Sequence, residues 1–143
     1  GDAQNIPESL PEEIVAADYA PYQTLLPRAC AVVHHGGVGT TAQGLLAGVP
    51  TLIVPFAFDQ FDNAEHARRM GTSRTLYRKR YTAANAAREL SELLSKEAYA
   101  EKAKDVSEQL KQENGPSVAA DLIERVLAGE QTRDQELAYA FSD

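Results

Sequence analysis

The apolar positions of this chain form short continuous runs in its first half and helical stripes in its second half. Runs at residues 14–17, 31–34 and 51–54, and a weaker one at 73–76, have the length of β-strands. Strands that are covered on both faces lose the alternation of apolar and polar positions, as the run at 51–54 does. We therefore predict four strands of a buried, parallel sheet.

Helices are predicted between these strands from their end signals. Residues 21–27 are bracketed by two prolines and are typical of a turn or a short helix. A helix that ends at Ala47 is expected before the third strand, because Gly48 and Pro50 follow it directly.

Side-chain spacing predicts the remaining helices. Asp62 and Glu65 are spaced as in a capping box, which predicts a helix that begins with Asp62 as its N-cap and ends at Gly71. From Thr82 onward the pattern is helical, with a break at residues 115–117. The apolar stripes of these three helices are Ala83, Ala86, Ala87, Leu90, Leu93 and Leu94; Tyr99, Ala103, Val106 and Leu110; and Val118, Leu122, Ile123 and Val126.

The order of these elements indicates the fold class. Strands that alternate with helices form βαβ units, so we predict an α/β fold, a Rossmann-like parallel sheet flanked by helices. A doubly wound domain usually has about six strands, whereas at most four are visible here. We therefore interpret residues 1–128 as the second half of such a domain, with its first βα units missing.

Composition and charge narrow the class of protein. The 143 residues are 43% apolar and 24% charged, as in an ordinary globular domain. The net charge of −7 argues against a general nucleic-acid binder, and no apolar run approaches the length of a membrane span. The single cysteine, Cys30, fits a reducing compartment, so we expect a cytoplasmic protein.

Positive charge is concentrated in one segment. Residues 66–80 hold six basic side chains and no acidic one, so the rest of the chain carries −13. A solvated or interdomain face is the plainer interpretation of such a segment. The alternative is that these side chains assist the binding of an anionic ligand nearby.

Candidate chemistry lies where the run at 31–34 leads into the next helix. Residues 35–41 are His-Gly-Gly-Val-Gly-Thr-Thr, a glycine-rich loop between a strand and a helix. The first N–H groups of a helix have no partner within it and carry the positive end of its dipole. Glycines let an anion approach that backbone, and His35, Thr40 and Thr41 add donors. We predict a phosphate or diphosphate site here, with an ordinary tight turn as the alternative.

Other ligands fit this loop less well. A P-loop needs Gly-Lys-Ser/Thr, which is missing from this sequence. Residues 37–42 match the dinucleotide fingerprint G-x-G-x-x-A, but the acid expected at the end of the next strand is missing, since the nearest is Asp59, beyond Pro55. The spacing of the three histidines matches no zinc motif, so no metal site is predicted.

Several motifs occur together over more than a third of the chain. They are Tyr-Ala-Pro at residues 19–21, Leu-Leu-Pro at 25–27, the glycine-rich loop at 35–41, Ala-Gly-Val-Pro at 47–50, and Asp-Gln-Phe-Asp-Asn-Ala at 59–64. In this order and spacing they resemble the donor-binding signature of family 1 glycosyltransferases of the GT-B type. That family includes plant, sterol and bacterial antibiotic glycosyltransferases, and this chain is most similar to the bacterial and sterol branch.

The resemblance implies a site for a nucleotide-sugar donor, a UDP- or TDP-hexose, with no cofactor and no metal. The 19–23 segment would hold the base, His35 and the loop after it the diphosphate, and Asp59 with Gln60 the hydroxyls of the transferred sugar. The residues that the resemblance assigns to the donor site are Tyr19, Tyr22, Gln23, His35, Gly37, Val38, Gly39, Thr40, Thr41, Gln43, Asp59 and Gln60.

Two departures from the family pattern limit what the chain is expected to do. Gln43 stands where many members have a Glu for the ribose hydroxyls, so the choice between UDP and TDP stays open. The N-terminal domain that binds the acceptor and supplies a histidine base is missing. No catalytic residue is therefore assigned in this chain, the fragment is expected to be inactive alone, and residues 129–143 are expected to pack on the missing domain.

These observations predict the donor-binding part of an inverting glycosyltransferase that moves a hexose to a hydroxyl group of a small-molecule acceptor. One alternative is a non-catalytic nucleotide-binding module or one chain of a split transferase. Another is an isomerase that acts on nucleotide sugars. Because half of a parallel sheet exposes a strand edge, a homodimer is also expected, with no nucleic-acid partner.

Overall fold

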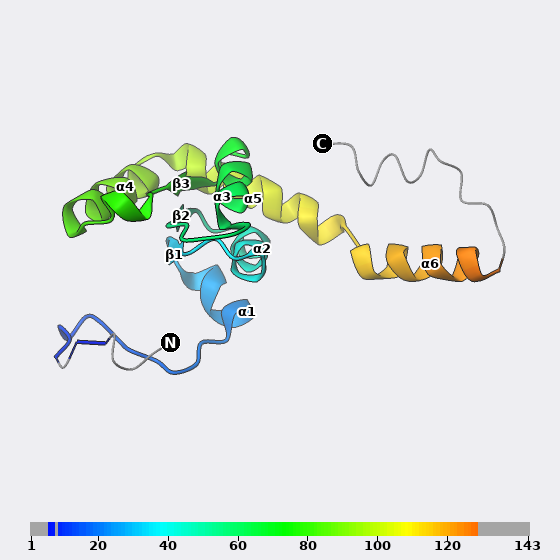
Figure 1. Ribbon diagram of the computed structural model, residues 1–143, viewed down its shortest axis with the longest axis horizontal. Coiled ribbons are helices and arrows are strands. Elements are labelled where there is room, and N and C mark those ends of the chain that lie inside the picture. The colour runs from blue at the N-terminus through cyan, green and yellow to red at the C-terminus, as the bar shows by residue number, and fades with distance from the viewer. Residues whose placement is uncertain (1–5, 8, 129–143) are drawn as a thin grey trace. The chain divides into compact units, whose positions relative to one another are not determined.

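The computed structural model describes residues 6–7 and 9–128, and its elements are shown in Figure 1. The chain divides into two compact units, Gly1–Glu108 and Gln109–Asp143. Residues 129–143, the predicted tail, lie outside the described residues. The elements in order are α1 (Tyr22–Leu25), η2 (Leu26–Arg28), β1 (Val32–His34), α2 (Val38–Ala47), β2 (Thr51–Ile53), α3 (Gln60–Arg69), β3 (Ser73–Thr75), η3 (Arg78–Arg80), α4 (Ala83–Ser95), α5 (Glu97–Gln112) and α6 (Gly115–Leu127).

The three strands form one parallel sheet in the order β1-β2-β3. The register pairs Val33 with Leu52 and Leu52 with Arg74, so β2 is central. All three residues of β2 are buried, as the continuous apolar run predicted. The structure thus confirms the α/β fold class, a Rossmann-like parallel sheet flanked by helices.

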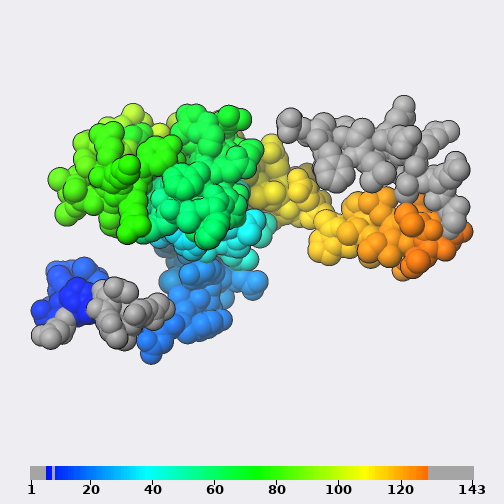
Figure 2. All heavy atoms as spheres, in the orientation of Figure 1, coloured from blue at the N-terminus to red at the C-terminus, as the bar shows by residue number. Residues whose placement is uncertain are grey.

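Helices cover both faces of this sheet. On one face, Ile53 packs against Ala64 and Ala67 of α3, and α2 lies close enough that a Cβ on Gly44 would be 3.1 Å from Thr51. Figure 2 shows the atoms of α2, in cyan, directly against those of α3, in green. On the other face, Leu52 belongs to a second buried cluster with Leu93 of α4. The side chains of β2 therefore belong to two buried clusters, one on each face of the sheet.

The predicted strand at residues 14–17 is wrong, since this segment has no regular secondary structure. Ile14 is 54% exposed and Val15 is 87% exposed, because neither side chain reaches the sheet. A strand is stable only when its backbone pairs with a neighbour, and a short apolar run does not show whether a neighbour exists.

The predicted start of α3 is also wrong. The helix begins at Gln60 with Asp59 as its N-cap, so Asp62 lies inside the first turn, and no side chain caps the helix. Glu65 instead accepts hydrogen bonds from Arg68 and Arg69 on the same helix. Its carboxylate pairs with these guanidinium groups one turn further along rather than reaching back to the N-terminus, which is why the capping-box spacing misleads.

Three later helices form as predicted, but α6 begins at Gly115, inside the predicted break at residues 115–117, and the predicted stripes are only partly buried, since Leu94 of α4 is 51% exposed. Thr82 caps α4 by accepting from the backbone N–H of Asn85, and the hydroxyl of Ser107 in α5 donates to the carbonyl of Leu46 at 2.7 Å. In α6, however, no described residue is buried, and Val118 and Ile123 are each more than half exposed. The periodicity of α6 is that of a helix with an apolar face, and the described residues do not cover that face.

Candidate functional site

The loop between β1 and α2 reverses the chain through glycines and presents a helix N-terminus. Gly36 has a φ of +91°, a left-handed conformation that favours glycine, and it is buried. Gly37 is the N-cap of α2, and no side chain bonds to the free N–H groups of the first turn. These are the N–H groups for which the sequence predicts an anionic ligand.

His35 lies beside this N-terminus. A Cβ placed on Gly37 would lie 2.6 Å from His35 Nε2, so the imidazole occupies the space that a side chain at 37 would need. At Gly39, by contrast, an added Cβ would meet nothing within 4 Å. The first turn of α2 thus has an imidazole beside Gly37 and open space at Gly39.

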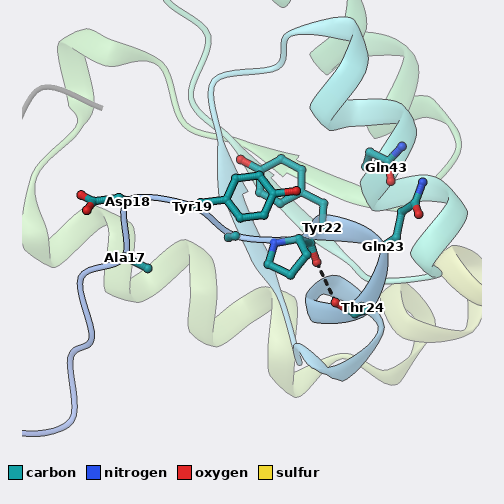
Figure 3. A pocket seen from close by; sticks show the side chains of 9 residues that line it. Ala17, Asp18, Tyr19, Tyr22, Gln23, Thr24 and Gln43 are labelled. Carbon is teal, nitrogen blue, oxygen red and sulfur yellow. Dashed lines mark hydrogen bonds between the residues drawn. The ribbon is translucent and has the colours of Figure 1, made fainter.

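A pocket of about 750 Å³ lies next to the same helix. It joins the segment before and within α1 to Gln43 of α2, about one turn after Thr40 (Figure 3). In Figure 3 the amides of Gln23 and Gln43 lie on the same side of the pocket, and the rings of Tyr19 and Tyr22 lie at its centre. The residues that line it are Ala17, Asp18, Tyr19, Ala20, Pro21, Tyr22, Gln23, Thr24 and Gln43.

The β2–α3 loop meets the glycine-rich loop directly. A Cβ on Gly36 would lie 3.0 Å from the carbonyl oxygen of Gln60, so the two loops are in close contact. Asn63 links them, because its Nδ2 donates to the carbonyl of Gly36 and to Asp59 Oδ2, both at 2.9 Å. Asn63 was not among the predicted site residues. Its position four residues after Asp59, about one helical turn, could have indicated that the two side chains meet.

Gln60 and Phe58 have unusual environments within this loop. Gln60 Oε1 accepts from the backbone N–H groups of Phe56 at 2.8 Å and Ala57 at 3.1 Å, which leaves its amide NH₂ as the free group. Phe58 has a φ of +56° and is 92% exposed. A left-handed backbone at a non-glycine residue costs about 1–2 kcal/mol, so hydrogen bonds elsewhere in the loop must hold this conformation.

The predicted donor-site residues lie in three parts of the structure, namely the pocket, the glycine-rich loop and the β2–α3 loop. Tyr19, Tyr22, Gln23 and Gln43 line the pocket, the loop at 35–40 follows, and Asp59 with Gln60 comes next. Thr41 is different, because it faces α3 in a hollow of about 220 Å³, and its hydroxyl is buried without a hydrogen-bond partner. The structure therefore places Thr41 between α2 and α3.

His34 anchors the start of the glycine-rich loop. Its Nδ1 accepts a hydrogen bond from the backbone N–H of Gly36 at 3.0 Å. Burial, and secondly the neighbouring His35, lower the pKa of His34 to about 4. The imidazole is therefore neutral at pH 7, and a proton on Nδ1 would break the bond to Gly36.

Folding stability is expected to decrease as the pH falls from about 7 to about 4. The unfolded chain binds a proton at His34 near pH 6.5, whereas the folded chain resists it until about pH 4. The loss should reach roughly 1–3 kcal/mol across the interval between those values. Thermal melts across this pH range measure it. His34→Asn, which keeps an acceptor for Gly36 but does not titrate there, should flatten the curve, and an unchanged slope would contradict the assignment.

The basic segment at 66–80 is largely paired within the fold. Arg68 and Arg69 bond to Glu65, and Arg74 bonds to Glu89 at 2.7 Å and to the hydroxyl of Tyr99. The Arg78 guanidinium lies over the ring of Phe56, 5.2 Å from its centroid. Three of the six cations thus have carboxylate partners within the fold, which argues against the alternative that the segment as a whole assists an anionic ligand.

The described residues offer neither a metal site nor a helix that could span a membrane. No group of three or more His, Cys, Asp and Glu side chains in residues 6–7 and 9–128 is arranged to hold a metal ion. None of the helices in the same residues is long and apolar enough to cross a bilayer.

Comparison with known proteins places the chain among glycosyltransferases. Residues 2–125 match the family described as erythromycin biosynthesis protein CIII-like, C-terminal domain. An uncharacterized UDP-glucosyltransferase of Bacillus subtilis, YojK, is 31% identical over 114 residues, which are 80% of this chain and 28% of that protein. A sterol 3-beta-glucosyltransferase of Debaryomyces hansenii is 40% identical over 114 residues, 80% of this chain and 7% of that protein.

Solved structures of glycosyltransferases share the fold of this chain and match most of its length. The glycotransferase of kitacinnamycin superposes with a TM-score of 0.77 at 34% identity, over 87% of this chain and 32% of its own. The glycosyltransferase VinC, solved in complex with DTDP, superposes at 0.69 with 29% identity, over 73% of this chain and 27% of its own. This chain spans less than a third of each of these relatives, and it belongs to the erythromycin biosynthesis protein CIII-like C-terminal domains of the family 1, GT-B glycosyltransferases.

Proposed function

We propose that this chain is the donor-binding part of an inverting glycosyltransferase, which transfers a hexose from a UDP- or TDP-hexose to a hydroxyl group of a small-molecule acceptor. The observation that carries the proposal is the pocket beside α2. Gln43 lines it, and the same helix presents its uncapped N-terminus next to His35. A nucleoside diphosphate has the two parts that such a site needs, a base and a diphosphate.

The diphosphate is the charged leaving group of the reaction, and the α2 N-terminus is suited to it. Backbone N–H groups at Val38, Gly39 and Thr40, the helix dipole and the imidazole of His35 would all act on its oxygens. Groups that are already oriented stabilise developing negative charge without reorganising, which lowers the barrier to departure. The DTDP complex of VinC supports a ligand of this class for the family.

The base and ribose would lie in the pocket itself. Tyr19 is 81% exposed and Tyr22 is 45% exposed, so both rings are free to pack against a flat base. Gln43 would bond to the ribose through its amide. Without the charge of a glutamate this contact is weaker, and it leaves the base contacts to decide between uracil and thymine.

The acceptor and its base catalyst would come from the remainder of a longer protein. This chain spans only 28% of the Bacillus subtilis YojK protein and 32% of the kitacinnamycin glycotransferase, so most of each relative has no counterpart in it. We therefore propose that the chain binds the donor but does not catalyse transfer alone.

Titration with UDP, and separately with TDP, is expected to shift two groups of backbone amides in NMR spectra. They are residues 19–24, which line the pocket, and residues 37–41 at the N-terminus of α2. Amides of α4, on the opposite face of the sheet, serve as the internal control. The nucleotide that saturates at the lower concentration identifies the donor class. Shifts that are absent with both nucleotides at millimolar concentration, or that centre elsewhere, would contradict the proposal.

A further inference from the structure

Phe58 is the only non-glycine residue with a positive φ in the described part of the chain. Its ring is also 92% exposed, although phenylalanine is among the residues most often buried. Both the left-handed backbone and the exposed ring are unfavourable in the free protein. An outlier of this kind, next to a proposed binding site, indicates a ring that is held ready for a partner.

The loop that carries Phe58 is fixed at both ends. Before it, the N–H groups of Phe56 and Ala57 donate to Gln60 Oε1. After it, Asp59 accepts from Asn63, which also bonds to the carbonyl of Gly36 in the glycine-rich loop. The position of Phe58 is therefore coupled to the N-terminus of α2, where the diphosphate is proposed to lie.

Three consecutive residues here offer groups of different chemistry. Phe58 offers an apolar ring, Asp59 a carboxylate acceptor, and Gln60 an amide NH₂ donor, since Gln60 Oε1 is already used. A hexose has the complementary groups, with hydroxyls around its rim and an apolar C–H surface on its ring face. A phosphate has no apolar face for the ring to cover, and the base is proposed to lie against Tyr19 and Tyr22 in the pocket instead.

We propose that Phe58 contacts the transferred sugar, with its ring packed against the C–H face of the hexose while Asp59 and Gln60 bond to the hydroxyls. This proposal rests on the proposed function and adds a specificity-determining residue to it. The ring selects for a donor that carries a pyranose and adds nothing to the binding of the free nucleoside diphosphate. The competing occupant is another segment of a longer protein.

The test compares nucleotide and nucleotide-sugar affinities of the whole chain by calorimetry, with UDP and UDP-glucose or, if they bind more tightly, TDP and TDP-glucose. In Phe58→Asn, the new residue tolerates the left-handed backbone but has no ring. We expect it to weaken UDP-glucose binding roughly two- to tenfold, the effect of one aromatic contact, and UDP binding by less than twofold. Phe58→Tyr should restore the wild-type affinity.

Tyr81→Ser is the matched control, because Tyr81 is also an exposed aromatic residue, 52% exposed, outside this loop. It should leave both affinities unchanged. A melting temperature of Phe58→Asn at or above that of the wild type shows that the loss of affinity is not a loss of folding. Equal losses of affinity for UDP and UDP-glucose, or no loss of affinity for either, would overturn this inference but not the proposed function. Failure of the wild type to bind any of the four ligands would overturn the proposed function and this inference with it.

Discussion

Replacing Gly36 by alanine is expected to lower the free energy of unfolding by about 2–4 kcal/mol. Two causes add. The φ of +91° is strained for any residue with a side chain, and the new Cβ would lie 2.8 Å from Ile53 Cγ2 and 3.0 Å from the carbonyl oxygen of Gln60. Neither neighbour moves easily, because Ile53 is fully buried and Gln60 begins α3.

The control is Gly39→Ala, three residues further along the same loop and helix. Its Cβ meets nothing within 4 Å and its φ is not positive, so alanine should raise stability by up to about 1 kcal/mol through its helix propensity. Chemical denaturation of both variants measures the two changes in the free energy of unfolding, which should have opposite signs. If Gly36→Ala unfolds at the same denaturant concentration as the wild type, the contact between the two loops is not as described.

Replacing His35 by alanine is expected to weaken the binding of UDP or TDP roughly tenfold or more, the effect of losing a hydrogen bond to a charged group. The imidazole lies against the N-cap of α2 and is exposed, so its loss removes a donor to the diphosphate and leaves the core unchanged. Calorimetric titration of wild type and variant gives the ratio of affinities.

Two comparisons separate a diphosphate contact from a general effect. His66→Ala removes an exposed histidine from α3, where its ring bonds to Asp62, and should leave the affinity unchanged. The nucleoside without phosphates should bind the wild type and His35→Ala equally, since it has nothing for the imidazole to contact. Equal affinity of both proteins for the diphosphate would refute the role of His35.

Much of the backbone around the candidate site could be predicted because it depends on residues that are close together in sequence. The glycines at 36, 37 and 39, the helix after them and its termination at Gly48 depend on backbone preferences within a few residues. The central strand was predictable for a similar reason, since burial on both faces requires an apolar residue at nearly every position.

Other features depended on which groups lie nearby in the folded chain. The run at 14–17 has strand character but no partner in the described residues, and the stripe of α6 has helical spacing but no core there. Asp62 and Glu65 have capping-box spacing, yet Glu65 bonds to arginines further along α3. In each case the local pattern was real, and the outcome was decided by which groups lay nearby in space.

By itself, the sequence determined the α/β class, the central strand, and the glycine-rich turn into a helix that marks this family. Only the tertiary structure decided that Asn63 joins the two loops, that Thr41 faces α3, and that Phe58 is held exposed with a left-handed backbone. The physical reason is range. Backbone propensity and side-chain spacing act over one or two turns, whereas Asn63 meets Gly36 across 27 positions of sequence and Thr41 meets a different helix, at places set by the whole sheet. The bonds around Phe58 are short in sequence, but they run through side chains that the apolar pattern does not reveal.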